Sequence, residues 1–331
     1  MNGSASVEIP LASLANDEAQ THFAHGAPVY VLVNPLEYHG PHLPRDTDAA
    51  IARGLAREVH ASLADDHRGA PLILGDEIAM GVEPTPGEGT VACQHRDVTK
   101  AVIAACKSAA SRGAQRIVLM TFHGHPLHND ALWAGVRWCR KNGIAAAAPL
   151  NVLLHEMLAL SRDPAACAKR FAPLRDMLSD HAERDAVIGE LPRDFHAGFF
   201  ETSMMLRYEP TRVDAIYREL PPCGVVTSLP GLERAARLAK LCGRETLASE
   251  LSYAAYGNGW HALDPFPGYT GRPALASVEA SGFFAGEIMP LFVENVRAAF
   301  AGNRGGPRPI LPWLRTVSFG GRLFRARVRK R

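Results

Sequence analysis

Short apolar stretches alternate with amphipathic helical segments along the first half of this chain. Residues 29–33 form an almost wholly apolar run that is typical of a buried strand. After it, Ile51, Leu55, Val59 and Leu63 recur every four residues, as they would on one face of a helix. The alternation continues with predicted strands at 71–78, 116–120 and 144–154 and predicted helices at 98–111 and 130–141. This pattern predicts an α/β fold with a largely parallel central sheet.

The second half of the chain is predicted to be mainly helical. Residues 155–195 are rich in Ala, Leu, Arg and Asp, and we expect them to be an extra helical insertion. A long helix is predicted over 277–301, because its apolar residues are spaced for one packed face. We expect residues 1–300 to form the main domain and residues 301–331 to form a basic tail.

Four potential metal-binding side chains follow the first predicted strand: Glu37, His39, His42 and Asp48. If the strand stays extended to its end, Glu37 and His39 project from one face, because side chains alternate with period two. The glycine and prolines between them turn the chain, so that Asp48 can return toward the strand end. Carboxylates mixed with imidazoles suit Zn, Mn or Fe better than calcium. The alternative is a surface turn in which Asp48 caps a helix.

The spacing of these residues, E-x-H-G-x-H-L-P-x-x-T-D, also resembles the opening motif of the creatininase family. Later segments resemble further family motifs in the same order: residues 117–126 a strand ending in N-G-H, residues 196–206 the run H-A-G-x-x-E-T-S-x-x-L, and residues 268–273 the G-x-x-G-x-P of many members outside the creatininases proper. Independent motifs in order are hard to match by chance. The resemblance implies a three-layer α/β/α fold with a largely parallel central sheet.

The resemblance also implies ligands for two divalent ions, namely Glu37, His39, Asp48, His123 and Glu201. Asp48 would bridge the ions, with Glu37 and His123 on the first and His39 and Glu201 on the second. The structural alternatives are a buried core histidine at His123 and, at Glu201, an acid that a helix start favours through its dipole.

His196 resembles the family's proton-transfer or substrate-binding histidine. An ordinary histidine pKa of about 6.5 suits protonation of an amine leaving group. His42 is expected to orient a ligand by a hydrogen bond. Arg45 could contact an anionic substrate group, although an exposed arginine is the simpler interpretation.

His125 is the main departure from the family pattern, because creatininases carry a Glu there that binds the second metal, and Thr121-Phe122 replaces their N-G. If the strand persists, His125 lies on the same side as His123 and is either an additional ligand or a substrate contact. Residues 85–90 fall where the family has a loop that shapes the substrate pocket, but an ordinary turn is the simpler interpretation.

Bulk properties exclude several protein classes. No apolar run approaches the roughly 18 residues needed to span a bilayer, and the N-terminus lacks the regions of a signal peptide. We therefore expect a cytoplasmic protein. The six cysteines are scattered without a C-x-x-C pair, which indicates buried thiols and neither a disulfide framework nor a zinc ribbon.

The C-terminal end is strongly basic, with nine basic residues and no acid from residue 304 onward, although the whole chain carries only +2. An anionic partner such as membrane or nucleic acid would explain this charge, and a solvated terminus is the alternative. Trp313, Leu314 and Phe324 indicate at least partial docking.

These observations predict a di-metal amidohydrolase that cleaves a C–N bond of a small cyclic amide, formamide or related compound. Two ions of Zn, Mn or Fe would activate a bridging water, and His196 would protonate the departing nitrogen. Family resemblance implies a homo-oligomer, often a hexamer. The competing prediction is a non-catalytic, metal-stabilised binding or assembly protein that uses its basic tail.

Overall fold

A computed structural model describes residues 7–178, 183–302 and 306–323. The chain divides into two compact units, which are described in turn. The first unit contains residues 1–37, 45–153 and 287–331, and the second contains residues 38–44 and 154–286. The sequence did not indicate that the metal-binding run would be divided between the units.

The first unit is built on a parallel sheet, which in the described residues has the strand order β1-β3-β2-β6-β7. Its strands are β1 (Glu8–Pro10), β2 (Val29–Val33), β3 (Leu72–Ile78), β6 (Arg116–Met120) and β7 (Ala145–Ala147). Val29 of β2 lies opposite Ile73 of β3 and Ile117 of β6, and all three side chains are fully buried. The apolar runs therefore form the centre of the sheet, as expected of parallel strands covered on both faces.

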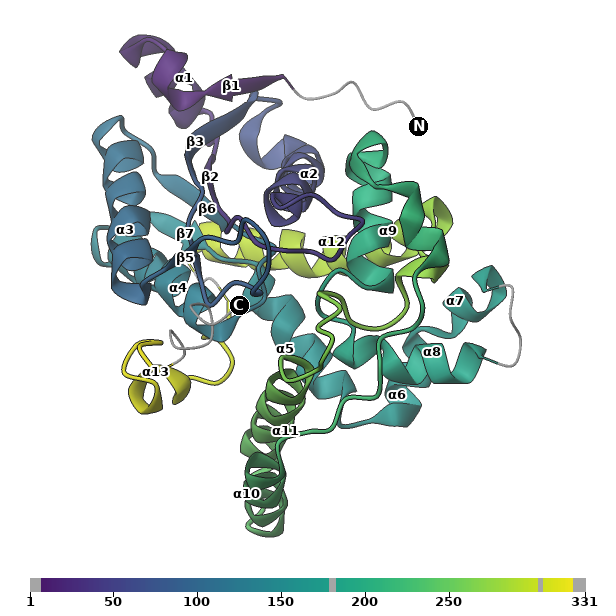
Figure 1. Ribbon diagram of the computed structural model, residues 1–331. Helices are drawn as coiled ribbons and strands as arrows, with labels where there is room; N and C mark the ends of the chain where they lie inside the picture. The colour runs from purple at the N-terminus through teal and green to yellow at the C-terminus, as the bar shows by residue number, and fades with distance from the viewer. Residues whose placement is uncertain (1–6, 179–182, 303–305, 324–331) are drawn as a thin grey trace. The chain divides into compact units, whose positions relative to one another are not determined.

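Helices cover both faces of this sheet. Figure 1 shows α3 (His95–Ser111) and α4 (Pro126–Lys141) on one face and α2 (Thr47–Ser62) on the other. This arrangement confirms the predicted three-layer α/β/α fold with a parallel central sheet. A small parallel pair, β4 (Gly81–Val82) and β5 (Ala92–Cys93), lies outside the main sheet.

The remaining helices of this unit include α1 (Asn16–Ala24) and α13 (Leu314–Val317). The second half of α12 (Val278–Phe300) also belongs to it, and this helix confirms the one predicted over 277–301. Arg297 ties α12 to the end of α2, donating to Asp66 Oδ2 at 2.9 Å and to the Ser62 carbonyl at 3.1 Å.

The predicted strand at 144–154 is wrong in its length. The strand ends at Ala147, and α5 (Leu150–Leu160) begins directly after Pro149. A short apolar run cannot be distinguished from a buried helix by periodicity alone, and Pro149 favours a helix start. Likewise, α4 begins at Pro126 instead of residue 130, because proline is well tolerated in the first helical turn.

That residues 155–195 are an inserted helical segment stays a prediction, although α-helices lie within them. In its described residues the second unit is mainly helical. It contains α6 (Pro164–Arg170), α7 (Ala172–Met177), α8 (Arg184–Glu190), α9 (Phe199–Tyr208), α10 (Pro230–Leu241) and α11 (Glu245–Trp260). Helices α10 and α11 pack as a hairpin. Trp260 at the end of α11 is 1% exposed, and its indole Nε1 donates to the Tyr269 carbonyl at 2.9 Å.

Part of the C-terminal segment is docked, as Trp313 and Leu314 indicated. Leu314 is buried, together with Ile310 and Leu311. Phe324 and six of the nine basic residues lie outside the described residues, and the domain boundary at residue 300 stays a prediction. Among the described residues, no helix is long and apolar enough to cross a bilayer.

Candidate metal centre

Glu37 is fully buried and is held by backbone groups on two sides. Strand β2 ends at Val33, so Glu37 and His39 do not continue an extended strand as expected. Instead the Glu37 N–H donates to the Arg45 carbonyl at 3.0 Å, and the Thr85 N–H donates to Glu37 Oε2 at 2.5 Å. The turn at residues 85–90 thus directly supports a predicted ligand.

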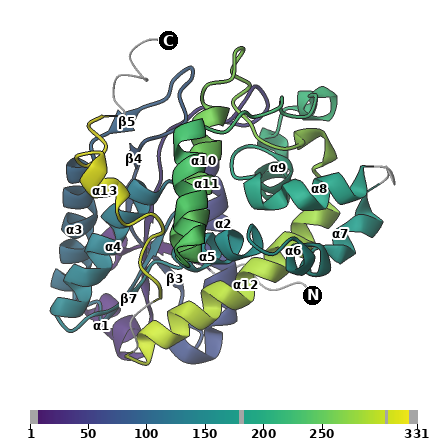
Figure 2. The ribbon, with the colours of Figure 1, turned by 90° about the horizontal axis from the view of Figure 1, so that it is seen from below.

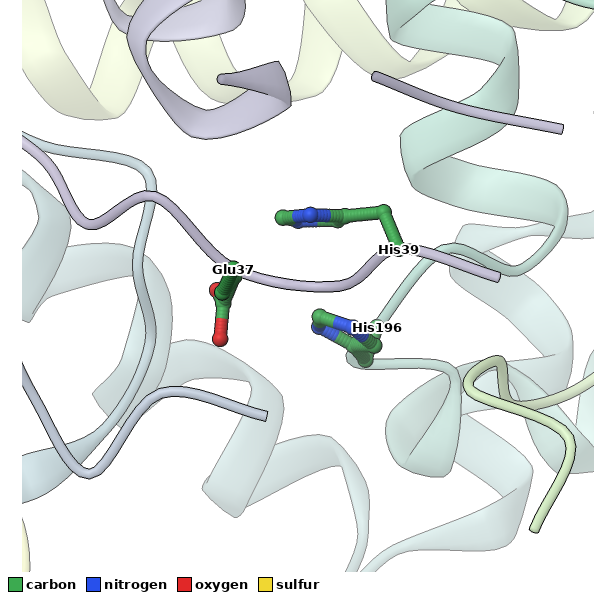
Figure 3. A group of neighbouring side chains, drawn as sticks. All are labelled: Glu37, His39 and His196. Carbon is green, nitrogen blue, oxygen red and sulfur yellow. The ribbon is translucent and has the colours of Figure 1, made fainter. Parts of the chain in front are cut away.

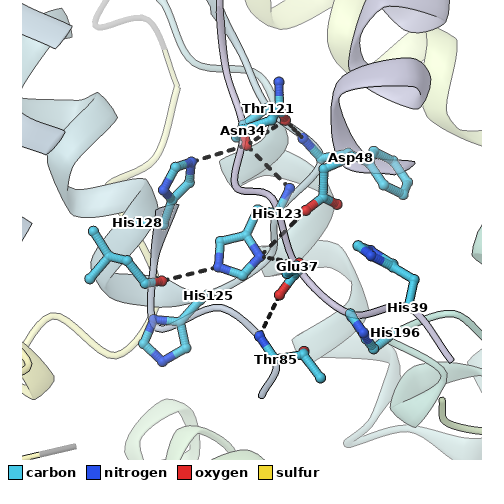
Figure 4. A network of polar contacts seen from close by, with 12 residues as sticks. Asn34, Glu37, His39, Asp48, Thr85, Thr121, His123, His125, His128 and His196 are labelled. Atoms are coloured by element: carbon cyan, nitrogen blue, oxygen red, sulfur yellow. Dashed lines mark hydrogen bonds and ion pairs between the residues drawn. The ribbon is translucent and has the colours of Figure 1, made fainter. Parts of the chain in front are cut away.

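Asp48 and His123 converge on Glu37 within the first unit. His123 Nδ1 lies 2.9 Å from Glu37 Oε1 and 3.7 Å from Asp48 Oδ2, and His123 Nε2 contacts the Val82 carbonyl at 3.1 Å (Figure 4). One donor atom from each of the three residues lies within 4.8 Å of the others. Asp48 comes from the first turn of α2, and His123 from the loop after β6.

The charges of this cluster fit a divalent cation. Burial alone would lower the pKa of His123, but the carboxylates of Glu37 and Asp48 raise that pKa to about 9. The imidazolium therefore offsets only part of the negative charge of the two acids when no metal is bound. Because a metal ligand must be a neutral imidazole, a bound cation would replace this proton. Two carboxylates and one imidazole suit Zn, Mn or Fe.

A polar network at the ends of β2 and β6 fixes the loop that carries His123. Asn34 Oδ1 accepts from the Thr121 hydroxyl at 3.1 Å and from the Phe122 N–H at 3.0 Å. His128 Nε2 lies 3.1 Å from the Val33 carbonyl. Burial and the neighbouring His123 lower the pKa of His128 to about 3, so it stays neutral. Sequence reasoning missed Asn34 and His128.

His125 has a structural role in the described protein. Strand β6 ends at Met120, so the expected extension to His125 does not occur. His125 is the N-cap of α4, and its Nδ1 accepts from the Leu127 N–H at 3.3 Å. Its ring centroid lies 6.2 Å from that of His123. Its assignment as a metal ligand or substrate contact stays a prediction.

The second unit brings together His39, His196 and Glu201. His39 Nε2 lies 3.8 Å from Glu201 Oε2, and the rings of His39 and His196 stack at 4.3 Å between centroids (Figure 3). All three side chains are buried. His196 Nε2 contacts the Tyr38 carbonyl at 2.8 Å. Glu201 Oε2 accepts from the Ala197 N–H at 2.5 Å, so a tight loop aims this carboxylate.

His42 contacts the residue next to Glu201. Its Nε2 lies 2.9 Å from Thr202 Oγ1, and the Thr202 hydroxyl donates to the Ala197 carbonyl at 3.3 Å. The His42 N–H therefore donates to Thr202. Burial and the nearby His39 lower the pKa of His42 to about 4, which keeps the ring neutral. Thr202 is not one of the predicted ligands, so the expected role of His42 in orienting a ligand stays a prediction.

A buried carboxylate, Asp194, joins two of the sequence motifs. It accepts from the Phe200 N–H at 2.9 Å and from the Thr270 hydroxyl at 3.0 Å. The Thr270 N–H donates in turn to the His196 carbonyl at 2.8 Å. Gly198 permits this arrangement, because a Cβ there would lie 1.7 Å from Asp194 Oδ1. Sequence reasoning missed Asp194 and Thr270, although both lie within or beside recognised motifs.

Arg45 is exposed, and its side chain lies against Gly89. A Cβ at Gly89 would clash with the guanidinium, so the arginine covers the 85–90 turn. Contact between Arg45 and a substrate stays a prediction.

Comparisons with known proteins give consistent results. A family model described as creatininase, creatinine amidohydrolase, matches residues 12–289. A mycofactocin precursor peptide peptidase of Mycobacterium tuberculosis is 32% identical over 133 residues, which are 38% of this chain and 51% of that protein. The chain thus spans about half the length of the curated relatives it matches.

Solved structures with this fold include a creatininase mutant of the Zn–Zn type, with a TM-score of 0.55 and 18% identity over 89% of this chain and 99% of that one. A putative creatinine amidohydrolase from Bacteroides fragilis has a TM-score of 0.54 and 16% identity over 90% and 97% of the two chains. At these identities the likeness demonstrates the fold alone.

Proposed function

Because the chain belongs to the creatininase family, as its match over residues 12–289 establishes, we propose that it is a metal-dependent amidohydrolase acting on a C–N bond of a small cyclic amide, formamide or related compound. The observation that carries the proposal is the buried cluster of Glu37, Asp48 and His123. Two carboxylates are costly to bury unless a cation accompanies them. A divalent ion would supply that charge and a reactive centre.

We extend the proposal to two ions, with Asp48 as the bridge. Glu37 and His123 would bind the first ion, and His39 and Glu201 would bind the second. Covalent geometry supports this, since α-carbons two residues apart are separated by at most about 7 Å. Glu37 and His39 are such a pair, so the ligands of the two ions share one short stretch of chain.

When bound, the ions would lower the pKa of a water between them and polarise the carbonyl that this water attacks. The chain's own residues would position the ligands and move the remaining proton. In the described geometry the His196 Nε2–H donates to the Tyr38 carbonyl, so Nδ1 is the atom that would carry the mobile proton. Protonation of the leaving nitrogen by His196 would complete C–N cleavage.

The substrate class follows from chemistry and from the relatives. Creatininases and a mycofactocin precursor peptide peptidase are among the proteins that this chain resembles. A test panel should therefore combine cyclic amides, formamides and short peptides. A homo-oligomer, hexameric by family resemblance, and a cytoplasmic location stay predictions, as does an anionic partner for the basic tail.

The first test compares Asp48→Ala with Glu88→Ala, which removes an exposed acid from the 85–90 turn. Asp48→Ala should lose bound metal and lower hydrolysis by more than about a hundredfold, the upper end for groups that merely orient ligands. Glu88→Ala should retain both. Metal content by mass spectrometry and turnover on the panel are the measurements. An Asp48→Ala protein that keeps its metal and full turnover would overturn the assignment.

A further inference from the structure

The C-terminal segment 306–323 packs into the unit that holds Glu37, Asp48 and His123, although it lies beyond the stretch that matches the family model. Ile310, Leu311 and Leu314 are at most 9% exposed. Figure 2 shows α13 of this segment beside α3 and α4, and α13 contacts α4. The buried leucine and isoleucine side chains indicate a docked element, because a solvated tail would leave them exposed.

An ion pair also attaches the segment to α4. Arg315 Nη1 lies 3.6 Å from Asp130 Oδ2, and the same carboxylate oxygen lies 2.9 Å from His95 Nε2 at the start of α3. Half-exposed pairs contribute little free energy by themselves. Here the pair mainly fixes where the segment meets the helix.

The two glycines of the turn after α13 differ in their surroundings. Gly320 and Gly321 both have left-handed backbones, with φ of 68° and 83°. A Cβ at Gly321 would lie 3.1 Å from Glu83 Oε1 and 3.2 Å from Leu127 Cδ1. A Cβ at Gly320 would meet nothing within 4 Å. Gly321 thus packs closely against Glu83 and Leu127, and Gly320 does not.

Glu83 and Leu127 belong to two segments that contact the metal cluster. Leu127 lies in the first turn of α4, and Asn129 of the same helix donates from Nδ2 to the His123 carbonyl at 3.0 Å. Glu83 follows Val82, whose carbonyl contacts His123 Nε2, and precedes Thr85, whose N–H donates to Glu37. Glu83 itself has a φ of 54°, a conformation that non-glycine residues adopt at a cost of about 1 kcal/mol. Such a loop needs external support to keep this conformation.

We propose that the segment 306–323 is a positioning element of the metal site, in which the Gly321 turn supports the 82–85 loop and the start of α4. Through these two contacts it holds Glu37 and His123 in ligand geometry. Groups that orient metal ligands commonly change metal affinity when they are altered. The inference rests on the metal assignment of the proposed function.

The decisive comparison is Gly321→Asn against Gly320→Asn. Asparagine tolerates left-handed backbone well, so both changes impose similar strain. Only the side chain at position 321 would displace Glu83 and Leu127. We expect Gly321→Asn to bind Zn²⁺ about ten- to a hundredfold more weakly than Gly320→Asn. Competition with a chromogenic chelator gives the affinity of the full chain, and urea unfolding of the metal-free proteins checks that their stabilities match.

A second pair of variants applies if Gly321→Asn does not fold. Arg315→Ala should weaken zinc binding about two- to fivefold, as loss of a half-exposed ion pair allows, while Arg322→Ala on the exposed turn should not. If the two variants of the pair that folds have equal zinc affinities, the inference about the segment 306–323 is overturned, but the proposed function is not. A wild-type chain that binds neither Zn²⁺ nor Mn²⁺ would overturn the proposed function as well.

Discussion

His123 combines burial, charge and metal chemistry in one side chain. Its pKa of about 9 results from Glu37 and Asp48, which outweigh the opposing effect of burial. The imidazole is therefore protonated at neutral pH in the metal-free protein. A metal ion can bind only by displacing that proton.

Zinc binding at this cluster should weaken as pH falls. Each unit of pH below about 9 should raise the apparent Kd about tenfold, because one proton on His123 competes with the ion. Calorimetric titration with Zn²⁺ at pH 6, 7 and 8 measures the trend. Buffers with different heats of ionisation count the protons released. A Kd that does not change with pH would contradict the role of His123.

Asp194 should make stability depend on pH in the opposite sense to an ordinary surface acid. Burial raises its pKa from 3.8 to about 7, so folding favours the protonated carboxyl. The wild-type protein then loses stability as pH rises from about 4 to about 7, by a few kcal/mol at most. Asp194→Asn cannot titrate, so its stability relative to wild type should increase over that window. Urea unfolding at pH 4.5, 6 and 7.5 tests this, and a constant difference would refute it.

At the scale of elements, the start of α9 depends on a close approach between motifs. The His196–Gly198 loop, Asp194 and Thr270 share hydrogen bonds and leave no volume for a side chain at position 198. The backbone of Gly198, with φ of −93°, is accessible to any residue. The glycine is needed for space and not for conformational freedom.

Gly198→Ala should therefore destabilise the protein by about 1–3 kcal/mol through overpacking. Gly189→Ala is the matched control, because a Cβ there meets nothing within 4 Å and position 189 lies inside α8. That change should be neutral or stabilising by up to about 1 kcal/mol. Thermal and urea unfolding compare the two variants. Similar effects at the two glycines would show that the close approach is not important.

At the scale of the whole molecule, the reactivity of the six cysteines depends on whether the protein is folded. All six are free thiols in the structure, and the expectation that they are buried is correct for three of them. Cys106, Cys139 and Cys167 are buried, whereas Cys242 is exposed at the end of α10. Burial also raises the pKa of Cys223 to about 11, which suppresses its thiolate.

A thiol reagent should therefore react quickly with Cys242 in the native protein and reach the buried cysteines only after unfolding. The colour that a disulfide reagent releases, followed with and without urea, gives the number of thiols that react in the native protein and in the unfolded protein. Cys242→Ser should remove the fast phase. Rapid labelling of all six thiols in the native protein would contradict the described packing. A reducing agent should leave the free energy of unfolding unchanged.

The local sequence pattern was sufficient to predict most helices and strands of the fold. The apolar runs of β2, β3 and β6 and the helix periodicity of α2 and α3 lie close to their predicted positions, because burial on a sheet or helix face imposes a short repeat. The prediction for 144–154 was wrong where this rule is weakest, in an apolar run that suits either structure. Motif spacing in the sequence also identified six candidate site residues, namely Glu37, His39, Asp48, His123, His196 and Glu201. Their roles as ligands and proton donor stay predictions.

What the sequence by itself determined is thus the layered α/β architecture and a set of candidate donor residues, since both follow from residue type and short spacing. Only the tertiary structure decided what supports those donors. Asn34 meets Thr121 across 87 positions, and Asp194 meets Thr270 across 76. The contact of Gly321 with Glu83 likewise joins distant parts of the chain. No local repeat encodes such pairs, because they form only when separate elements pack together and bury polar groups that then need partners.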